Sequence, residues 1–120
     1  METQKIVVSL SVARVGHGGN TGKGQYFYSF EPENILVADP DTVVAFELSD
    51  DTPDEIEIWK IVTSSPAQFR NVKFGKGHRS ASLINANTVE QLISVSVLVT
   101  DKKADGRVVN CDPQMINVPR

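Results

Sequence analysis

The amino-acid sequence predicts an all-β fold, an antiparallel two-sheet sandwich with an immunoglobulin-like Greek key and about 7–9 short strands. Apolar and polar residues alternate with a period of two in several segments, which is typical of strands with one buried face. Turn-forming residues recur roughly every 8–12 positions. Helix signals are nearly absent, so nothing is available to cover both faces of a parallel sheet. With 120 residues, 40% of them hydrophobic, residues 1–120 are expected to form one domain, and a small barrel is the alternative architecture.

Four strands are expected in the first half of the chain. In the first of them, Val8, Leu10 and Val12 fall on one face. The glycine loop, residues 16–24, then interrupts regular structure, because its five glycines would cost too much backbone entropy inside a strand. The expected strands are 5–15, 26–30, 35–38 and 42–48, the last with Val44, Phe46 and Leu48 on its core face.

The second half of the chain contains the strongest strand pattern, 92–100, in which all the odd-numbered residues are apolar. The segment 101–106 predicts a hairpin loop, since Asp105-Gly106 favours the positive φ that such loops require. The expected strands of this half are 56–63, 69–74, 92–100 and 107–118.

Three further segments complete the expected layout. Residues 81–86 show only weak structure, and 88–92 is the one segment that would tolerate a helical turn. Proline donates no ladder hydrogen bond, so Asp112-Pro113 predicts a β-bulge that divides the last strand. Such a bend would allow the strand to serve both sheets.

The composition restricts the classes of partner. A net charge of −3 and a pI near 5.3 give no broad attraction for nucleic acid, so nucleic acid is not an expected partner. No run of about 18 apolar residues predicts a membrane helix, and Met1–Lys5 lack the features of a signal peptide. Cys111 is the single cysteine, which excludes an intrachain disulfide and favours a cytoplasmic location.

A basic segment between residues 70 and 79 is the main candidate binding site. It contains no acidic residue, and as a loop it would attract a phosphate, a carboxylate or the acidic loop (residues 47–57) of another copy. The alternative interpretation is a solvated surface. The candidate binding residues are Arg70, Lys73, Lys76, His78 and Arg79.

Three parts of the sequence carry residues of the kind that metal or phosphate sites use. The residue types of a blue-copper site are present, but no histidine follows Cys111, which is expected to be a small apolar residue in the last strand. The acidic loop lacks the EF-hand pattern, so it supports at most a weak Ca²⁺ site. The glycine loop has no P-loop spacing and is expected to be a mobile connection, or a flexible ligand loop. No metal and no cofactor are therefore predicted; the copper-type residues are His17, His78, Cys111 and Met115.

The pieces Glu31-Pro32, 38–46 and 111–116 resemble the DP-EP family of bacterial proteins, a group without an established function. The C-terminal pattern is also similar to AidA-type bacterial inclusion-body proteins, although Cys111 stands where that group has an aromatic residue. The resemblance implies a bacterial β-sandwich and supplies no catalytic residues. Independently of it, the Asp39 and Asp112 carboxylates are expected to accept backbone N–H groups at turns. The structural motif comprises Glu31, Pro32, Asp39, Pro40, Asp112 and Pro113.

The expected function is a non-enzymatic interaction or self-assembling module. No nucleophile elbow or other local catalytic signature is present, so an enzyme is not predicted. The expected partner is a protein, either another copy of the chain or a different protein, bound through strand edges and oppositely charged loops. One alternative is a sugar or anion site on the Arg70–Arg79 loop or the glycine loop, and aromatic residues at 26–28 and Trp59 would suit sugar rings or core packing. The second alternative is a weak metal-binding domain.

Overall fold

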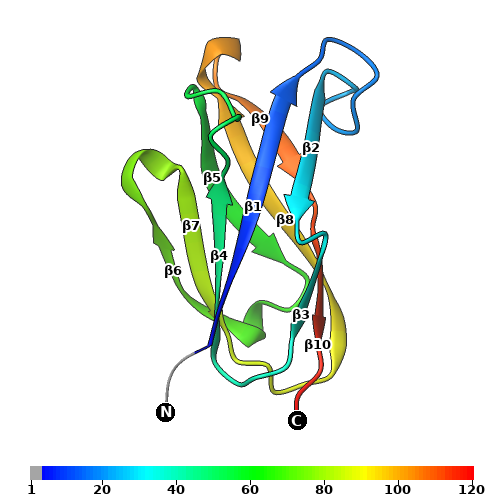
Figure 1. Cartoon of the computed structure of the whole chain (residues 1–120), viewed down its shortest axis with the longest axis vertical. Helices are drawn as coiled ribbons and strands as arrows, with labels where there is room; N and C mark the ends of the chain where they lie inside the picture. The colour runs from blue at the N-terminus through cyan, green and yellow to red at the C-terminus, as the bar shows by residue number, and fades with distance from the viewer. Residues whose placement is uncertain (1–3) are drawn as a thin grey trace.

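The structure, a computed structural model, describes residues 4–120 and contains ten strands in two sheets that face each other (Figure 1). Met1–Thr3, on which part of the signal-peptide prediction rests, lie outside the described residues. Sheet I has the strand order β2-β1-β4-β7-β6. Sheet II has the order β3-β10-β8-β5, and β9 also pairs with β8. The sandwich-like, all-β part of the prediction is confirmed.

The strands of sheet I are β1 (Lys5–Arg14), β2 (Tyr26–Glu31), β4 (Thr42–Leu48), β6 (Phe69–Phe74) and β7 (Ser80–Asn85). The strands of sheet II are β3 (Asn34–Val37), β5 (Ile56–Thr63), β8 (Gln91–Asp101), β9 (Arg107–Cys111) and β10 (Gln114–Asn117). Three single turns of 3-10 helix connect them: η1 (Pro66–Gln68), η2 (Lys76–His78) and η3 (Lys102–Ala104). Within residues 4–120, no helix has the length and apolarity to cross a bilayer.

The prediction of a purely antiparallel sandwich was wrong, because each sheet contains one parallel pair. β1 runs parallel to β4, and β3 runs parallel to β10. After the β1–β2 hairpin the chain crosses to sheet II as β3 and returns to sheet I as β4, on the free side of β1. Because the chain passes through sheet II between β2 and β4, β4 can lie parallel to β1 without a connecting helix.

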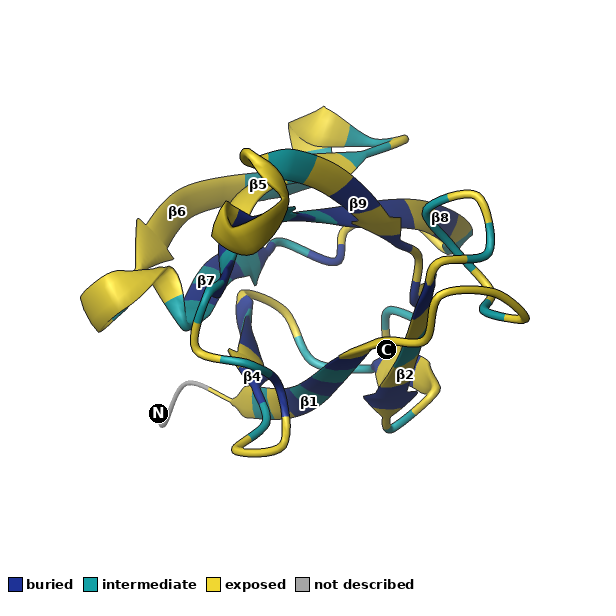
Figure 2. Ribbon diagram, turned by 90° about the horizontal axis from the view of Figure 1, so that it is seen from above, coloured by how far each residue is buried: buried dark blue, intermediate teal, exposed yellow. Residues whose placement is uncertain are grey.

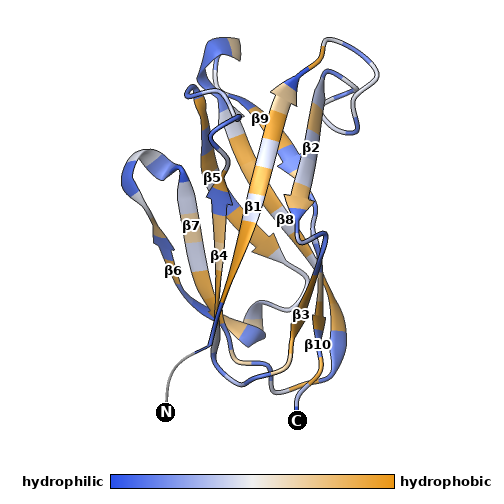
Figure 3. Ribbon diagram, in the orientation of Figure 1, coloured by the Kyte–Doolittle hydropathy of each residue, from blue (hydrophilic) through white to orange (hydrophobic). Residues whose placement is uncertain are grey.

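The core lies between the sheets and is built from the apolar faces of the alternating strands (Figures 2 and 3). Val8, Leu10 and Val12 of β1 are buried as predicted, and every odd-numbered residue from 93 to 101 of β8 is buried. The largest fully buried side chain in this core is Phe46, whose ring meets Phe30 edge-on at a centroid distance of 6.1 Å. Burying these side chains supplies most of the driving force for the fold.

The last strand is divided at Asp112-Pro113 as predicted, but not by a bulge and not between two sheets. Both halves pair with β8, and the register is the same on each side: Cys111 lies opposite Val97, and Gln114 lies opposite Ser94. Two residues on each strand separate these pairs, so no residue is inserted. Only the strand pairing is interrupted.

The interruption follows from the direction of the β8 backbone. The N–H and C=O of Ser94 face β5, where they bond Ser64. Alternate residues face opposite edges, so the backbone of Val95 faces Pro113 across the ladder. Pro113 has no N–H to donate to Val95. The proline therefore removes one rung of the ladder while the strands remain aligned.

Two sequence expectations for the 80–92 region were wrong. Residues 80–85 form a regular strand, β7, paired on both sides, and residues 88–90 form no helical turn. The β8–β9 connection does contain the predicted positive φ, with Asp105 at 56° and Gly106 at 73°. Its first three residues form η3, which the sequence pattern did not indicate.

The two sheets are also joined by a pair of buried asparagines. Asn85 of β7 donates to the Asn117 side-chain oxygen of β10 at 2.7 Å, and Asn117 returns a bond at 3.2 Å. Asn85 also accepts from the backbone N–H of Asn87 at 2.9 Å. Because each amide satisfies the other, the polar atoms are buried without the cost of unpaired groups.

The free strand edges are protected in different ways. The pairing of β5 with β8 shifts register between Ile58 and Lys60, and that of β6 with β7 shifts between Arg70 and Lys73. Such irregularities and basic side chains hinder the addition of a further strand. These edges are therefore poor candidates for the strand-edge association expected from the sequence.

Candidate functional site

Arg79, the last residue of the basic segment, is held by the acidic loop. Its Nη1 donates to the carbonyl oxygens of Pro53 at 2.8 Å and Ile56 at 2.9 Å. Its Nη2 donates to those of Ser49 at 3.2 Å and Thr52 at 2.9 Å. Both terminal nitrogens are thus used inside the molecule. Arg79 positions a loop, with no carboxylate involved in these bonds.

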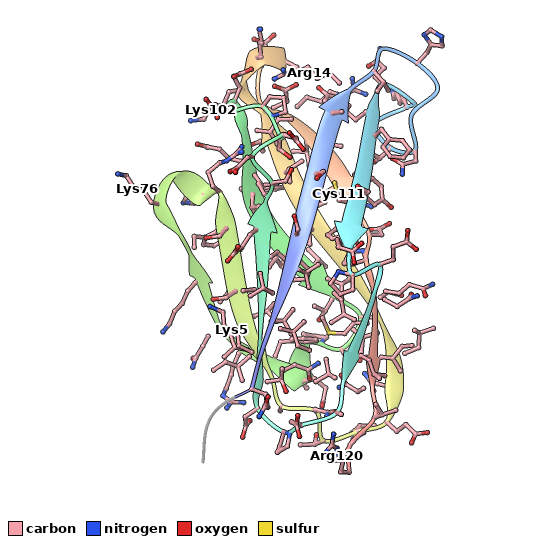
Figure 4. All side chains as sticks on the ribbon, viewed as in Figure 1. Lys5, Arg14, Lys76, Lys102, Cys111 and Arg120 are labelled. Carbon is pink, nitrogen blue, oxygen red and sulfur yellow. The ribbon has the colours of Figure 1, made fainter. Side chains whose placement is uncertain are left out.

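The other basic residues are spread along an extended hairpin. Arg70 forms an exposed ion pair with Asp41 at 2.8 Å. Lys73 is exposed on β6, and Lys76 lies at the tip of the β6–β7 hairpin (Figure 4). His78 is exposed but has contacts within the molecule: its Nδ1 lies 3.2 Å from the Ile58 carbonyl oxygen, and its ring stacks on Phe74 at 4.6 Å. The structure does not bring the five side chains to one point, and their role in binding stays a prediction.

The acidic loop is organised through its backbone. Of its carboxylates, Glu55 pairs with Arg14 at 3.1 Å and Glu57 pairs with Lys102 at 3.0 Å. Within residues 4–120, no three His, Cys, Asp or Glu side chains are grouped so that they would hold a metal ion. The carbonyl oxygens that converge in this loop are oriented toward the Arg79 guanidinium. The remaining acidic side chains are exposed: Glu47, Asp50, Asp51 and Asp54.

The glycine loop forms a compact structure on β2. The Asn20 side chain donates to the Tyr28 carbonyl at 3.0 Å and accepts from the Tyr28 N–H at 2.9 Å, so it occupies the free edge of β2. A Cβ on Gly19 would lie 2.0 Å from the Tyr26 carbonyl oxygen, and one on Gly22 would lie 2.6 Å from the Tyr26 ring. The glycines are needed here for close approach of the loop to β2.

A cluster around the buried Asp101 carboxylate lies at the same end of the sandwich, where Figure 4 labels Arg14. Arg14 binds the Asp101 carboxylate with two nitrogens, at 2.8 and 2.6 Å. The Tyr26 hydroxyl donates to Asp101 at 2.7 Å, and the Lys103 N–H donates at 3.0 Å. These bonds hold the pKa of Asp101 at about 2, with the Arg14 bond as the largest cause. Burial, followed by the bond to Asp101, raises the pKa of Tyr26.

Sequence reasoning missed this cluster, although a signal was present. Asp101 continues the odd-numbered core face of β8, which placed its carboxylate inside the sandwich. A carboxylate at such a position requires a buried cation or several donors. Arg14, at the end of β1, is the basic residue that supplies this partner.

The Asp-Pro and Glu-Pro pieces lie at three turns or interruptions. Glu31-Pro32 connects β2 to β3. At the second piece, the Asp39 carbonyl oxygen accepts from the Thr42 hydroxyl at 2.7 Å. At the third, the Asp112 carboxylate accepts from the Ser96 hydroxyl at 2.9 Å and from the Asn110 amide at 3.2 Å. Neither aspartate carboxylate accepts a backbone N–H from residues 4–120, so the expected Asx-type turns are not formed; side chains are the donors to Asp112.

Two hollows meet at the Asp112–Gln114 junction. The larger, which we term the junction cleft, has a volume of about 420 Å³ and lies between β2 and the β9–β10 junction. The smaller, about 270 Å³, lies on the outer face of sheet II beside β8. Aromatic, carboxylate and amide side chains line the junction cleft, among them Phe27, Tyr28, Glu33, Asn34, Asp112 and Gln114.

The outer face of sheet II also carries an apolar row across three adjacent strands. Ile116 of β10 lies opposite Leu36 of β3 on one side and opposite Leu92 of β8 on the other. Leu36 is 59% exposed and Leu92 is 65% exposed, the two largest values among the bulky apolar residues of the described chain. The next row of the face contains neutral polar residues: Asn34, Gln114 and Ser94.

The copper-type residues Cys111, His17 and Met115 lie in three different parts of the fold. Cys111 is fully buried, and desolvation, together with the charge of Asp112, raises the pKa of its thiol to about 12. A thiol in that state is a small core residue and a poor nucleophile. His17 lies in the glycine loop, and Met115 is buried in β10 against the Asn85 amide.

Comparison of the chain with protein-family models gave no match, and comparison with curated proteins gave none either. The resemblance to the DP-EP family therefore stays a prediction based on its dipeptides.

Proposed function

We propose that the chain is a non-enzymatic interaction module that associates with a second copy of itself through the apolar row Leu36–Ile116–Leu92. The observation that carries the proposal is the alignment of two strongly exposed leucines with Ile116 across three paired strands. Solvent-exposed apolar residues that are contiguous on one face favour association, whereas scattered ones do not.

A second copy fits this face because the row and its neighbouring row carry no charged side chain. In a two-fold dimer each patch meets its own equivalent, so a charge near the axis would face a like charge. The chain has a net charge of −3, so a contact face without charged side chains avoids adding to the repulsion between two copies. The immunoglobulin-like Greek key belongs to the same proposal, since the outer faces of a two-sheet sandwich are available for pairing.

The alternative route of association, through oppositely charged loops, has less support. Arg79 is bound within its own acidic loop, and Arg70 is paired with Asp41. Fewer free charges therefore remain for a head-to-tail contact. A module without catalytic function is also supported by the burial of the Cys111 thiol.

The test is sedimentation velocity of the wild-type protein over a range from low micromolar to near-millimolar concentration, at low and at high salt. We expect a monomer–dimer equilibrium that persists at high salt, because apolar contacts are not screened. Leu92→Ser should weaken the dimer at least about tenfold. A monomer at every concentration would overturn the proposal, and loss of the dimer at high salt would favour the charged loops.

Val72→Ser provides the matched control. Val72 is 48% exposed on β6, at an edge of the other sheet. Its substitution removes a similar apolar side chain from the surface and should leave the dimer unchanged. An equal effect of the Val72 and Leu92 variants would contradict the assignment of the contact to the row.

A further inference from the structure

We infer that the junction cleft is a binding site for a neutral saccharide. This inference goes beyond the proposed self-association: it concerns a separate hollow, although Asn34 and Gln114 also stand in the row next to the apolar row. The cleft volume of about 420 Å³ is in the range of small-ligand sites and suits one or two sugar rings.

The first argument is that β2 contributes aromatic residues to the lining of the cleft. Phe27 is 48% exposed, and Tyr28, the next residue of the strand, is half-buried on the opposite face of β2. Aromatic rings present flat apolar area with little conformational entropy to lose. The C–H face of a pyranose ring is the complementary surface. The Tyr28 ring packs edge-on against Phe30 at 5.7 Å, so it is held in place before any ligand arrives.

The second argument is the set of polar groups that line the cleft. Two carboxylates, Glu33 and Asp112, accept hydrogen bonds, whereas two amides, Asn34 and Gln114, both donate and accept. Vicinal hydroxyl groups need this mixture of donors and acceptors. A purely cationic ligand would use the carboxylates and leave the amides without a role.

The third argument is charge. None of the residues that line the cleft is basic, and two are acidic. Phosphate, sulfate and carboxylate ligands are therefore repelled. The anion alternative for the chain thus does not apply to this cleft, and an uncharged polyol remains as the matching ligand.

The fourth argument is rigidity. Bonds from Ser96 and Asn110 orient the Asp112 carboxylate. The Asn20 amide fixes the backbone of Tyr28 from the opposite side. Groups that are already fixed lose little entropy when they bind, which favours even a small ligand.

The experiment is a titration of the ¹⁵N-labelled full chain with methyl glycosides of glucose, galactose, mannose and N-acetylglucosamine, followed by amide chemical shifts. We expect shifts at residues 27–34 and 112–114 for at least one glycoside. Phe27→Ser should weaken binding about tenfold, since one ring contact is lost. Gln114→Ala, on an exposed position, is the second variant if Phe27→Ser fails to fold.

Trp59→Ser is the control, because Trp59 is an aromatic side chain of similar exposure, 51%, that does not line the cleft. Its substitution should leave the affinity unchanged. Three results would overturn the inference: no shifts with any glycoside at tens of millimolar, shifts centred on Trp59, or cleft shifts produced by spermidine and by no glycoside.

Discussion

Arg79 is the side chain on which the acidic loop depends most. Its two terminal nitrogens bond four backbone carbonyl groups between the end of β4 and the start of β5. Hydrogen bonds from a charged donor are worth more than neutral ones, and a planar guanidinium can satisfy several acceptors at once. A single residue at the start of β7 therefore determines the path of the chain between β4 and β5.

Replacement of Arg79 by Met should lower the free energy of unfolding by about 2–3 kcal/mol. The four carbonyl groups lose their common donor, and the loop must find water or another arrangement. Chemical denaturation measures the change directly. Arg79→Lys should recover only part of the stability, since an ammonium group cannot reach all four oxygens.

Arg70→Met is the control for that prediction. Arg70 makes one exposed ion pair with Asp41, so its loss should cost no more than about 0.5 kcal/mol. If both variants unfold at the same denaturant concentration, the carbonyl contacts of Arg79 contribute nothing measurable.

At the scale of the elements, the two Asp-Pro pieces have different roles. Asp112-Pro113 separates β9 from β10, whereas Asp39-Pro40 lies in the connection between β3 and β4. The Asp112 carboxylate accepts from Ser96 on the facing strand and from Asn110. Asp112→Ala should therefore destabilise the protein by about 1 kcal/mol. Thermal unfolding measures the difference.

Asp39→Ala is the matched variant, since the one partner of the Asp39 carboxylate within residues 4–120 is distant, Arg120 at 3.9 Å. Its loss should be close to neutral, because the Asp39 carbonyl oxygen, which binds Thr42, remains. Equal losses from the two variants would show that the side-chain bonds of Asp112 are not what stabilises the junction.

The glycine loop offers a second prediction at this scale. Gly19→Ala places a methyl group against the Tyr26 carbonyl oxygen and must displace the loop, at a cost of about 2 kcal/mol or more. Gly18→Ala meets no atom within 4 Å, and its positive φ alone should cost about 1 kcal/mol. A larger loss for Gly18→Ala, measured by denaturation, would contradict the close packing of the loop on β2.

Most strands could be predicted because their pattern is local. β4, β5 and β6 have the predicted bounds, since alternation and turn residues are read directly along the chain. β7 was missed because its inward side chains include a small residue, Ala81, and a polar one, Asn85. The parallel pairings could not be predicted, because they depend on which sheet the chain enters after β2.

The candidate site was less predictable for a related reason. The charge of Arg79 gave no sign of its acceptors, which are backbone carbonyl groups from a distant segment. The junction cleft combines residues from β2 with residues near the C-terminus. These residues come together only through the pairing of the strands, and the spacing of residues in the sequence does not predict that pairing.

At the scale of the whole molecule, the Arg14–Asp101 pair connects the two sheets and should make stability depend on acid pH. The folded protein holds the pKa of Asp101 at about 2, below its ordinary value near 4. Its stabilising contribution is therefore fully present above pH 4 and is lost as the pH falls toward 2. The contribution amounts to about 2 kcal/mol.

Urea denaturation at several pH values between 2 and 6 tests this prediction. The stability of the wild-type protein should fall steeply below pH 4, and Asp101→Asn should show a weaker dependence over the same range. Glu55→Gln is the control, because Glu55 is 40% exposed and should leave the slope nearly unchanged. Parallel curves for wild type and Asp101→Asn would exclude Asp101 as the origin of the acid sensitivity.

The Asn20 side chain, which occupies the free edge of β2, also limits how large an assembly can grow. Its amide takes both backbone groups of Tyr28, the position at which an incoming strand would begin to add. Stacking through one sheet face consumes that face in each copy, and the blocked edge offers no second route for growth. The β2 edge therefore gives the proposed dimer no starting point for growth by strand addition.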